Sequence, residues 1–236
     1  LYATVYPTDY NEDGKTDLIV GNNGLNNQFK ASPEKPMKIY SIFDTVNKVK
    51  PGFLFSYYCK DVEAFASPRA EVLQEFVPYR KIFPNFSSYA KSDVKSFFKM
   101  VNLPVPDPTL ICTNLLSGVY INQGDGSFKF EAFPDILQTS KVTGVETIDW
   151  NYDGKKDYLL TGNFIAYKHQ FGPLDAFPAY VLENQGAGKY RVIFPNESGL
   201  FIDGQTKKAC VMQSPKKNRV LFVRNNDKIL LYENKK

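Results

Sequence analysis

Short apolar runs alternate with polar turns along most of the chain. Leu18–Val20 and Tyr158–Leu160 each follow an acidic turn, and three further runs at 207–212, 219–224 and 228–232 are separated by polar residues. Runs of this length, bounded by turn-forming residues, are typical of β-strands. The chain has 15 glycines and 15 prolines for turns, and 15% of its residues are aromatic, which strands favour. We therefore predict an all-β fold.

One segment, at about 67–101, has helical spacing instead. Ser67 and Ser92 are candidate N-caps, and Pro68 suits the first position of a helix. Apolar residues recur after each cap at intervals of three and four: Val72, Leu73, Phe76 and Val77, then Val94, Phe97, Phe98 and Val101. We predict a helical insertion in a sheet protein, which either docks a partner or covers one end of the sheets.

Two phrases occur twice in the sequence. The pattern D-x-N-x-D-G-K-x-D begins at Asp9 and again at Asp149, and each copy leads into a short, mostly apolar run and then Gly-Asn. A strand that enters Asn-Gln-Gly-x-Gly and leaves through an aromatic residue occurs at 119–128 and at 181–190, as a tight hairpin turn requires. These repeats predict about four antiparallel, four-stranded units, at roughly 1–43, 44–134, 135–196 and 197–236, with the helical insertion lengthening the second.

The acidic phrase has the spacing of a calcium loop. Oxygen donors stand at alternate positions around a glycine, Gly14 or Gly154, where the chain must turn sharply. Three carboxylates held close together repel one another unless a cation neutralises them. The predicted ligands are Asp9, Asn11, Asp13, the Lys15 carbonyl and Asp17 in the first loop, and Asp149, Asn151, Asp153, the Lys155 carbonyl and Asp157 in the second.

The calcium loop differs from an EF-hand. Position 12, where an EF-hand has a bidentate glutamate, is Val20 in the first copy and Leu160 in the second. Both residues lie in apolar runs, so the loop is predicted to join two strands. The alternative is an Asp/Asn/Gly-rich turn without metal.

These motifs carry a family resemblance. The acidic loop that runs into a strand, together with the Asn-x-Gly-Asp-Gly-x-Phe hairpin at 122–128, resembles the FG-GAP/VCBS repeats of integrin-like β-propellers. The stretches 20–26, 29–36 and 194–200 are similar to the region that follows the ASPIC/UnbV domain in surface proteins of Bacteroidetes-type bacteria.

The resemblance implies β-propeller blades, and because the family has six to eight, it implies that these four units are part of a larger propeller. It also implies two structural Ca²⁺ ions, an extracytoplasmic location (cell surface, secreted or periplasmic), and a role in protein or carbohydrate recognition or as a scaffold, without catalysis.

Charge and composition add little to this picture. The 29 basic and 25 acidic residues give a net charge of +4 without a long run of one sign, which argues against nucleic acid or a membrane surface as partner. No stretch approaches the roughly 18 apolar residues of a membrane span, and the first residues do not read as a signal peptide. The three cysteines fit neither a disulfide framework nor a zinc site, so we expect buried small hydrophobes at Cys59, Cys112 and Cys210.

The alternative function is a carbohydrate-active enzyme, a glycoside hydrolase or lyase, on a calcium-stabilised propeller. Its acid/base pair would be Asp61 with Glu63, or Glu71 with Glu75, although the second pair also fits a solvated helix face. His169 and Cys59 are isolated, and we expect a surface imidazole and a buried thiol.

A binding surface would use amides and aromatic rings on loops. Trp150 occupies the same loop position as Tyr10, so both rings are alternatively expected to pack between blades. The candidates for ligand contact are Asn22, Asn23, Asn26, Asn27, Tyr57, Tyr58, Trp150 and Tyr167.

Overall fold

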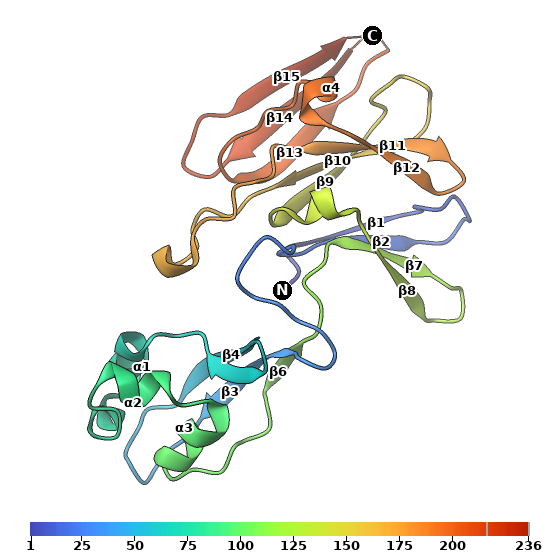
Figure 1. Ribbon diagram of the computed structural model, residues 1–236. Helices are drawn as coiled ribbons and strands as arrows, with labels where there is room; N and C mark the ends of the chain where they lie inside the picture. Colours follow the sequence, from blue (N-terminus) through green and yellow to red (C-terminus); the bar gives the residue numbers. More distant parts are fainter. Residues whose placement is uncertain (216, 236) are drawn as a thin grey trace. The chain divides into compact units, whose positions relative to one another are not determined.

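Strands dominate the computed structural model, which describes residues 1–215 and 217–235 (Figure 1). Its strands form four antiparallel sheets of three or four strands each, which confirms the predicted predominance of β-structure. The chain divides into two compact units: a main unit of Leu1–Gln28 and Leu115–Lys236, and an inserted unit of Phe29–Asn114. No helix among the described residues is long and apolar enough to cross a membrane.

The main unit contains three sheets. Sheet 1 has the strand order β1-β2-β7-β8, sheet 2 runs from β9 to β12 in chain order, and sheet 3 has the order β13-β14-β15. The strands are β1 Thr4–Thr8, β2 Asp17–Gly21, β7 Gly118–Asn122, β8 Phe128–Ala132, β9 Val142–Ile148, β10 Asp157–Gly162, β11 Tyr180–Gly186, β12 Lys189–Ile193, β13 Thr206–Met212, β14 Lys217–Arg224 and β15 Leu230–Lys235. Three short helices connect them: η2 Asp135–Gln138, η3 His169–Phe171 and α4 Pro195–Ser198.

Sheet 2 lies between the other two and is buried on both faces. Successive side chains of a strand point to opposite faces, so β10 sends Tyr158 and Leu160 into one apolar core with sheet 1 and Leu159 into a second core with sheet 3. Every residue of β10 is buried as a result. This explains why its sequence reads as a continuous apolar run rather than an alternating one.

The inserted unit combines a sheet with helices. Its sheet has the order β5-β4-β3-β6, and one apolar core joins the sheet to the helices. The elements are β3 Met37–Ile42, β4 Gly52–Cys59, β5 Val62–Phe65, α1 Arg69–Glu75, η1 Val77–Lys81, α2 Phe86–Ala90, α3 Val94–Met100 and β6 Leu110–Cys112. The predicted helical insertion at 67–101 therefore contains helices, but it belongs to a larger folded unit.

Several details of the helical prediction are wrong. The N-cap of α3 is Asp93, not Ser92, because the Asp93 carboxylate accepts from Ser96 N at 2.6 Å. Pro68 precedes α1 and no side chain caps that helix, so Ser67 is not a cap either. Val77 is exposed because it lies in η1, where the helical phase of α1 has already ended.

The predicted division at residues 43 and 44 is also wrong. Sheet 1 is built from two separate chain segments, because β2 pairs with β7 after the inserted unit. Strands β3 and β4, which the division separates, pair with each other inside that unit.

The expectation of buried cysteines fails as well. Cys59 and Cys210 are exposed and Cys112 is partly exposed. Cys59 lies at the end of β4, beside the turn into β5, where the sheet no longer covers it. Cys210 lies on the face of β13 opposite to buried Ala209.

Candidate metal centre

Each acidic loop joins two strands, as predicted, and these are the first two strands of a sheet. The first loop lies between β1 and β2, and the second between β9 and β10. Gly14 and Gly154 adopt φ values of 82° and 85°, a left-handed conformation that glycine reaches without strain. Glu12 and Tyr152, two residues earlier, share a φ of 63°. The two loops therefore follow the same backbone path despite different residues at this position.

In each loop, the carboxylate of the first predicted ligand accepts hydrogen bonds from two backbone amides further along the loop. We call this carboxylate with its two amide donors a cradle. Asp9 Oδ1 accepts from Asp13 N and Oδ2 accepts from Gly14 N, both at 3.0 Å. Asp149 accepts from Asp153 N and Gly154 N at the same distances. The two cradles thus match atom for atom.

The third carboxylate of each loop is fully buried and links the loop to the hairpin phrase. Asp17 accepts from Tyr10 N at 2.9 Å and from Asn122 N at 2.8 Å. The equivalent Asp157 accepts from Trp150 N and Asn184 N, both at 2.7 Å. The two phrases that recur in the sequence therefore meet in space. Sequence reasoning missed Asn122 and Asn184 as parts of the site, although their recurrence was the available signal.

The charges in the loops are only partly balanced. Burial raises the pKa of Asp157, and the nearby carboxylates of Asp153 and Asp149 raise it further against the backbone hydrogen bonds that lower it. The pKa of Asp153 is lowered, first of all by the hydrogen bond from Lys155 N. Lys155 Nζ lies 3.6 Å from Asp153 Oδ2 and supplies partial neutralisation. A cation at the loop would neutralise the remaining negative charge.

The donor set suits a hard cation. Each loop offers carboxylate, amide and carbonyl oxygens, which Ca²⁺ prefers, and neither loop offers sulfur or imidazole. In both copies the amide group of the asparagine donates to the second aspartate, at 3.1 Å for Asn11 to Asp13 and for Asn151 to Asp153. The oxygen of the same amide accepts from Asp13 N at 3.2 Å in the first loop and from Asp153 N at 3.1 Å in the second, so the side chain would have to turn to present it to a cation. Across the described residues, no three His, Cys, Asp or Glu side chains are gathered closely enough to hold an ion. The calcium site remains a prediction.

The first loop is attached to sheet 2. Tyr10 stacks on Tyr190 with ring centroids 4.3 Å apart, and the Tyr190 hydroxyl donates to the Tyr10 carbonyl at 2.8 Å. Asn184 Nδ2 also donates to Glu12 Oε1 at 2.8 Å. Tyr10 thus packs between two sheets, which is the structural alternative considered for this position.

The second loop is attached to sheet 3. The Tyr152 hydroxyl accepts from Asn218 N at 2.7 Å and donates to the Asn234 carbonyl at 2.8 Å, so it bridges β14 and β15. The Asn218 and Asn234 side chains donate to the carbonyls of Asp149 and Trp150 at 2.6 and 2.9 Å. Each loop therefore connects its own sheet to the next one.

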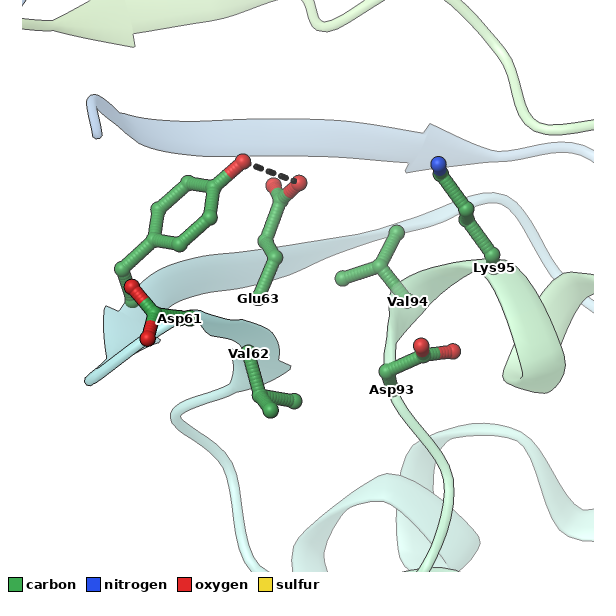
Figure 2. A pocket seen from close by; sticks show the side chains of 7 residues that line it. Asp61, Val62, Glu63, Asp93, Val94 and Lys95 are labelled. Atoms are coloured by element: carbon green, nitrogen blue, oxygen red, sulfur yellow. Dashed lines mark hydrogen bonds between the residues drawn. The ribbon is translucent and has the colours of Figure 1, made fainter. Parts of the chain in front are cut away.

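The carboxylates considered for catalysis lie in the inserted unit, two of them at a pocket of about 170 Å³ (Figure 2). Burial opposes ionisation of Glu63, but hydrogen bonds from Ser56, Lys38 and Tyr40 outweigh it and hold its pKa below the usual range. The Tyr58 hydroxyl also donates to Glu63 Oε2, at 3.4 Å.

The other two acids of this pocket, Asp61 and Asp93, also have lowered pKa values. The pKa of Asp61 is lowered by its hydrogen bond and charge pairing with Lys35, and that of Asp93 by hydrogen bonds from Ser96. The general acid of a glycosidase has a raised pKa, whereas the pKa of each of the three carboxyls of this pocket is lowered.

The remaining candidates are scattered. Glu71 is half-buried and Glu75 is exposed on α1, and His169 is exposed in η3. Asn22 and Asn23 are buried, and Asn23 Nδ2 donates to the Tyr167 hydroxyl at 3.2 Å.

Of the other loop amides, Asn26 is exposed, and Asn27 Nδ2 donates to the Gly24 carbonyl at 3.0 Å. Tyr57 and Tyr58 belong to the inserted unit, whereas Trp150 and Tyr167 belong to the main unit.

Comparisons of the chain with protein-family models, with curated proteins and with solved structures gave no match. Function must therefore follow from the chain's own residues.

Proposed function

We propose that the main unit is a segment of a calcium-binding β-propeller that acts in recognition or as a scaffold in an extracytoplasmic protein, without catalysis of its own. The observation that carries this proposal is the matching hydrogen bonding of the two acidic loops, 9–17 and 149–157, in which the first aspartate accepts from the same two backbone amides. The resemblance to FG-GAP/VCBS repeats supports the propeller and the location.

The order of the sheets supports a blade arrangement. β9 packs beside both β1 and β13, so the first strands of the three sheets lie in succession. In a propeller, the first strands of successive blades follow one another around the central axis in this way. Sheets 1 and 2 also have the four strands of a blade.

Calcium would act structurally at these loops. Ion binding to the folded loop but not to the unfolded chain stabilises the fold. Because Tyr190 bonds to the first loop and Asn218 and Asn234 bond to the second, an ion that orders a loop also orders the contact between two sheets.

Calcium removal is the first test. We expect EDTA to lower the melting temperature by several degrees and millimolar calcium to restore it, since extracellular calcium modules bind with Kd values of roughly 10⁻⁴ to 10⁻³ M. Magnesium, which keeps its water shell more firmly, is the control and should restore less. Melting curves that are identical in EDTA and in calcium argue against the two sites.

Ion stoichiometry tests the ligand assignment. Asp13→Ala and Asp153→Ala should each remove about one bound calcium per chain, measured by equilibrium dialysis and elemental analysis. Asp125→Ala is the matched control, because Asp125 is an exposed turn carboxylate outside both loops. If both loop variants keep the calcium content of the parent chain, the assignment is wrong.

The non-catalytic role is tested with a panel of glycans. We expect no new reducing ends or released products after prolonged incubation with calcium present. Product formation that depends on Glu63 or Asp61 would replace the proposal with the carbohydrate-active alternative.

A further inference from the structure

The inserted unit has a hollow with a basic lining, beside the turn between β4 and β5. It measures about 260 Å³. Three of its lining residues are lysines and none is acidic: the lining consists of Lys30, Ala31, Ser32, Lys35, Tyr58 and Lys60. All six residues belong to the inserted unit, so the hollow lies within one folded part of the chain.

The positive charge of this basic hollow is only partly neutralised. Lys35 Nζ donates to Asp61 Oδ1 at 2.5 Å and to the Lys60 carbonyl at 3.0 Å, so the Lys35 charge has a partner. The Lys60 ammonium has no ion pair and no hydrogen bond with any residue that the structure describes. A negatively charged group that enters the hollow would therefore meet a positive charge that no carboxylate balances.

The acidic pocket of Figure 2 shares Tyr58 with the basic hollow but differs in charge balance. Its three carboxylates accept hydrogen bonds from side chains of the same unit: Asp61 from Lys35, Glu63 from Lys38, and Asp93 from Ser96. The acidic pocket thus has its counter-charges and donors within the chain, whereas the basic hollow does not. The ligand that the structure favours is therefore an anion.

Both sides of the basic hollow are held in place. Ser32 Oγ accepts from Lys35 N at 3.1 Å and Ser32 N donates to the Lys35 carbonyl at 3.2 Å, which closes a turn that contains Pro33. On the other side, Lys60 has a φ of 57° in the two-residue turn between β4 and β5. The Lys35 ammonium joins the two sides through the Lys60 carbonyl. A lining that is already ordered loses little conformational entropy when a ligand binds.

Tyr58 gives the basic hollow a flat apolar surface. Its hydroxyl donates to Glu63, and Lys38 Nζ lies 5.7 Å from the centroid of its ring, so the ring is anchored by neighbours outside the hollow. An aromatic ring packs well against the C–H groups of a sugar ring. The volume is below the range of about 300–1,000 Å³ for pockets that hold drug-sized ligands, so it suits a single sugar ring.

We propose that the basic hollow binds an anionic sugar residue of a polysaccharide. The sugar ring packs on Tyr58, and its carboxylate or sulfate group pairs with Lys60 and Lys35. A phosphopeptide fits less well, because lysines are point charges without the forked geometry by which arginines recognise phosphate. The inference goes beyond the proposed function, which concerns the main unit, since it assigns a ligand class to the inserted unit.

Calorimetric titration with three short sugars tests the ligand class. The probes are trigalacturonate, which carries carboxylates, sulfated maltotriose, and neutral maltotriose. We expect saturable binding of at least one anionic probe and none of the neutral one, and the stronger anionic probe identifies the acidic group. Raising the NaCl concentration from 0.05 to 0.5 M should weaken that binding about tenfold, because salt screens the ion pairs.

Two pairs of variants test the named contacts. Lys60→Gln should weaken binding of the anionic probe about fivefold. Lys48→Gln is its matched control and should bind as the parent chain does, because Lys48 is an exposed lysine of the same unit with a φ of 55° that does not line the hollow. Tyr58→Leu should weaken binding about fivefold to tenfold, whereas Tyr58→Phe keeps the ring and should bind normally.

Four outcomes would overturn the proposal: no binding of either anionic sugar, equal binding of maltotriose, unchanged binding in Lys60→Gln, or tighter binding of a tyrosine-phosphorylated peptide or of inorganic sulfate than of any sugar. Each titration is run in calcium and in EDTA. The calcium loops lie in the main unit, so anionic sugar binding without a calcium response leaves this inference standing while the calcium proposal fails. A calcium response without sugar binding does the reverse.

Discussion

The two junctions of the main unit start from the same loop and end differently. At the first junction, Tyr10 is covered by Tyr190 of the fourth strand of sheet 2, and the space is filled. At the second junction, Trp150 borders a hollow of about 410 Å³, and sheet 3 has three strands among the residues that the structure describes. The loop geometry is therefore set locally, whereas the closure of the junction depends on what the next sheet supplies.

The largest loss of unfolding free energy should come from removing the tyrosine ring that fills the first junction. Tyr10 is 9% exposed and stacks against both Tyr158 and Tyr190, so Tyr10→Ala leaves a cavity and should cost about 3–5 kcal/mol of unfolding free energy. Trp150→Ala removes a larger ring from a site that is already hollow, and we expect a cost of about 2 kcal/mol. Urea unfolding of both variants measures the difference. Equal costs would mean that the junctions are filled to the same extent.

The next-largest loss of unfolding free energy should be similar at the two junctions, when the buried carboxylate of each loop is removed. Asp17→Ala leaves three backbone amides without their acceptor, one of them weakly bonded at 3.4 Å, and Asp157→Ala leaves two, so we expect a cost of about 2–4 kcal/mol for each even in EDTA. The controls, Asp13→Ala and Asp153→Ala, alter exposed carboxylates and should cost about 1 kcal/mol or less without calcium. Thermal unfolding in EDTA separates the two pairs. The reverse order would mean that the buried carboxylates matter only as metal ligands.

The smallest effect concerns single hydroxyls. Tyr152→Phe removes the bridge between β14 and β15 and should cost about 1–2 kcal/mol, with faster hydrogen exchange at the Asn218 amide. Tyr190→Phe removes the hydroxyl that donates to the Tyr10 carbonyl and also hydrogen-bonds with the Tyr158 side chain, and it should cost about 1 kcal/mol. Unchanged exchange at Asn218 in Tyr152→Phe would show that the hydroxyl does not hold the two strands together.

Much of the local structure could be predicted from the sequence. The apolar run after Asp157 is strand β10, and the helical spacing at Val94, Phe97 and Phe98 is the buried face of α3. The N-cap of that helix was misplaced by one residue. Asp93 and Ser92 are both good caps, and only the backbone conformation of Asp93 decides between them.

The domain organisation could not be predicted in the same way. Periodicity shows that a strand exists, but it does not show which strand is its partner. The segment with helical spacing indicated an insertion of about 35 residues, but the folded unit also includes β3, β4, β5 and β6, whose sequences resemble those of the other strands. The core that joins these strands to Phe76, Phe97 and Phe98 defines the unit.

The sequence by itself determined the two acidic turns, because the hydrogen bonds within them join residues at most seven positions apart, such as Asp9 with Gly14 and Tyr10 with Asp17, and depend on the backbone torsions of a few residues. The tertiary structure alone decided the partner of the second Asp17 oxygen, since Asn122 lies 105 residues further along the chain. The tertiary structure also decided that the Tyr10 ring is covered by Tyr190, whereas the Trp150 ring borders a hollow. Contacts over such separations depend on how whole sheets pack, and the local pattern of residues does not encode that packing.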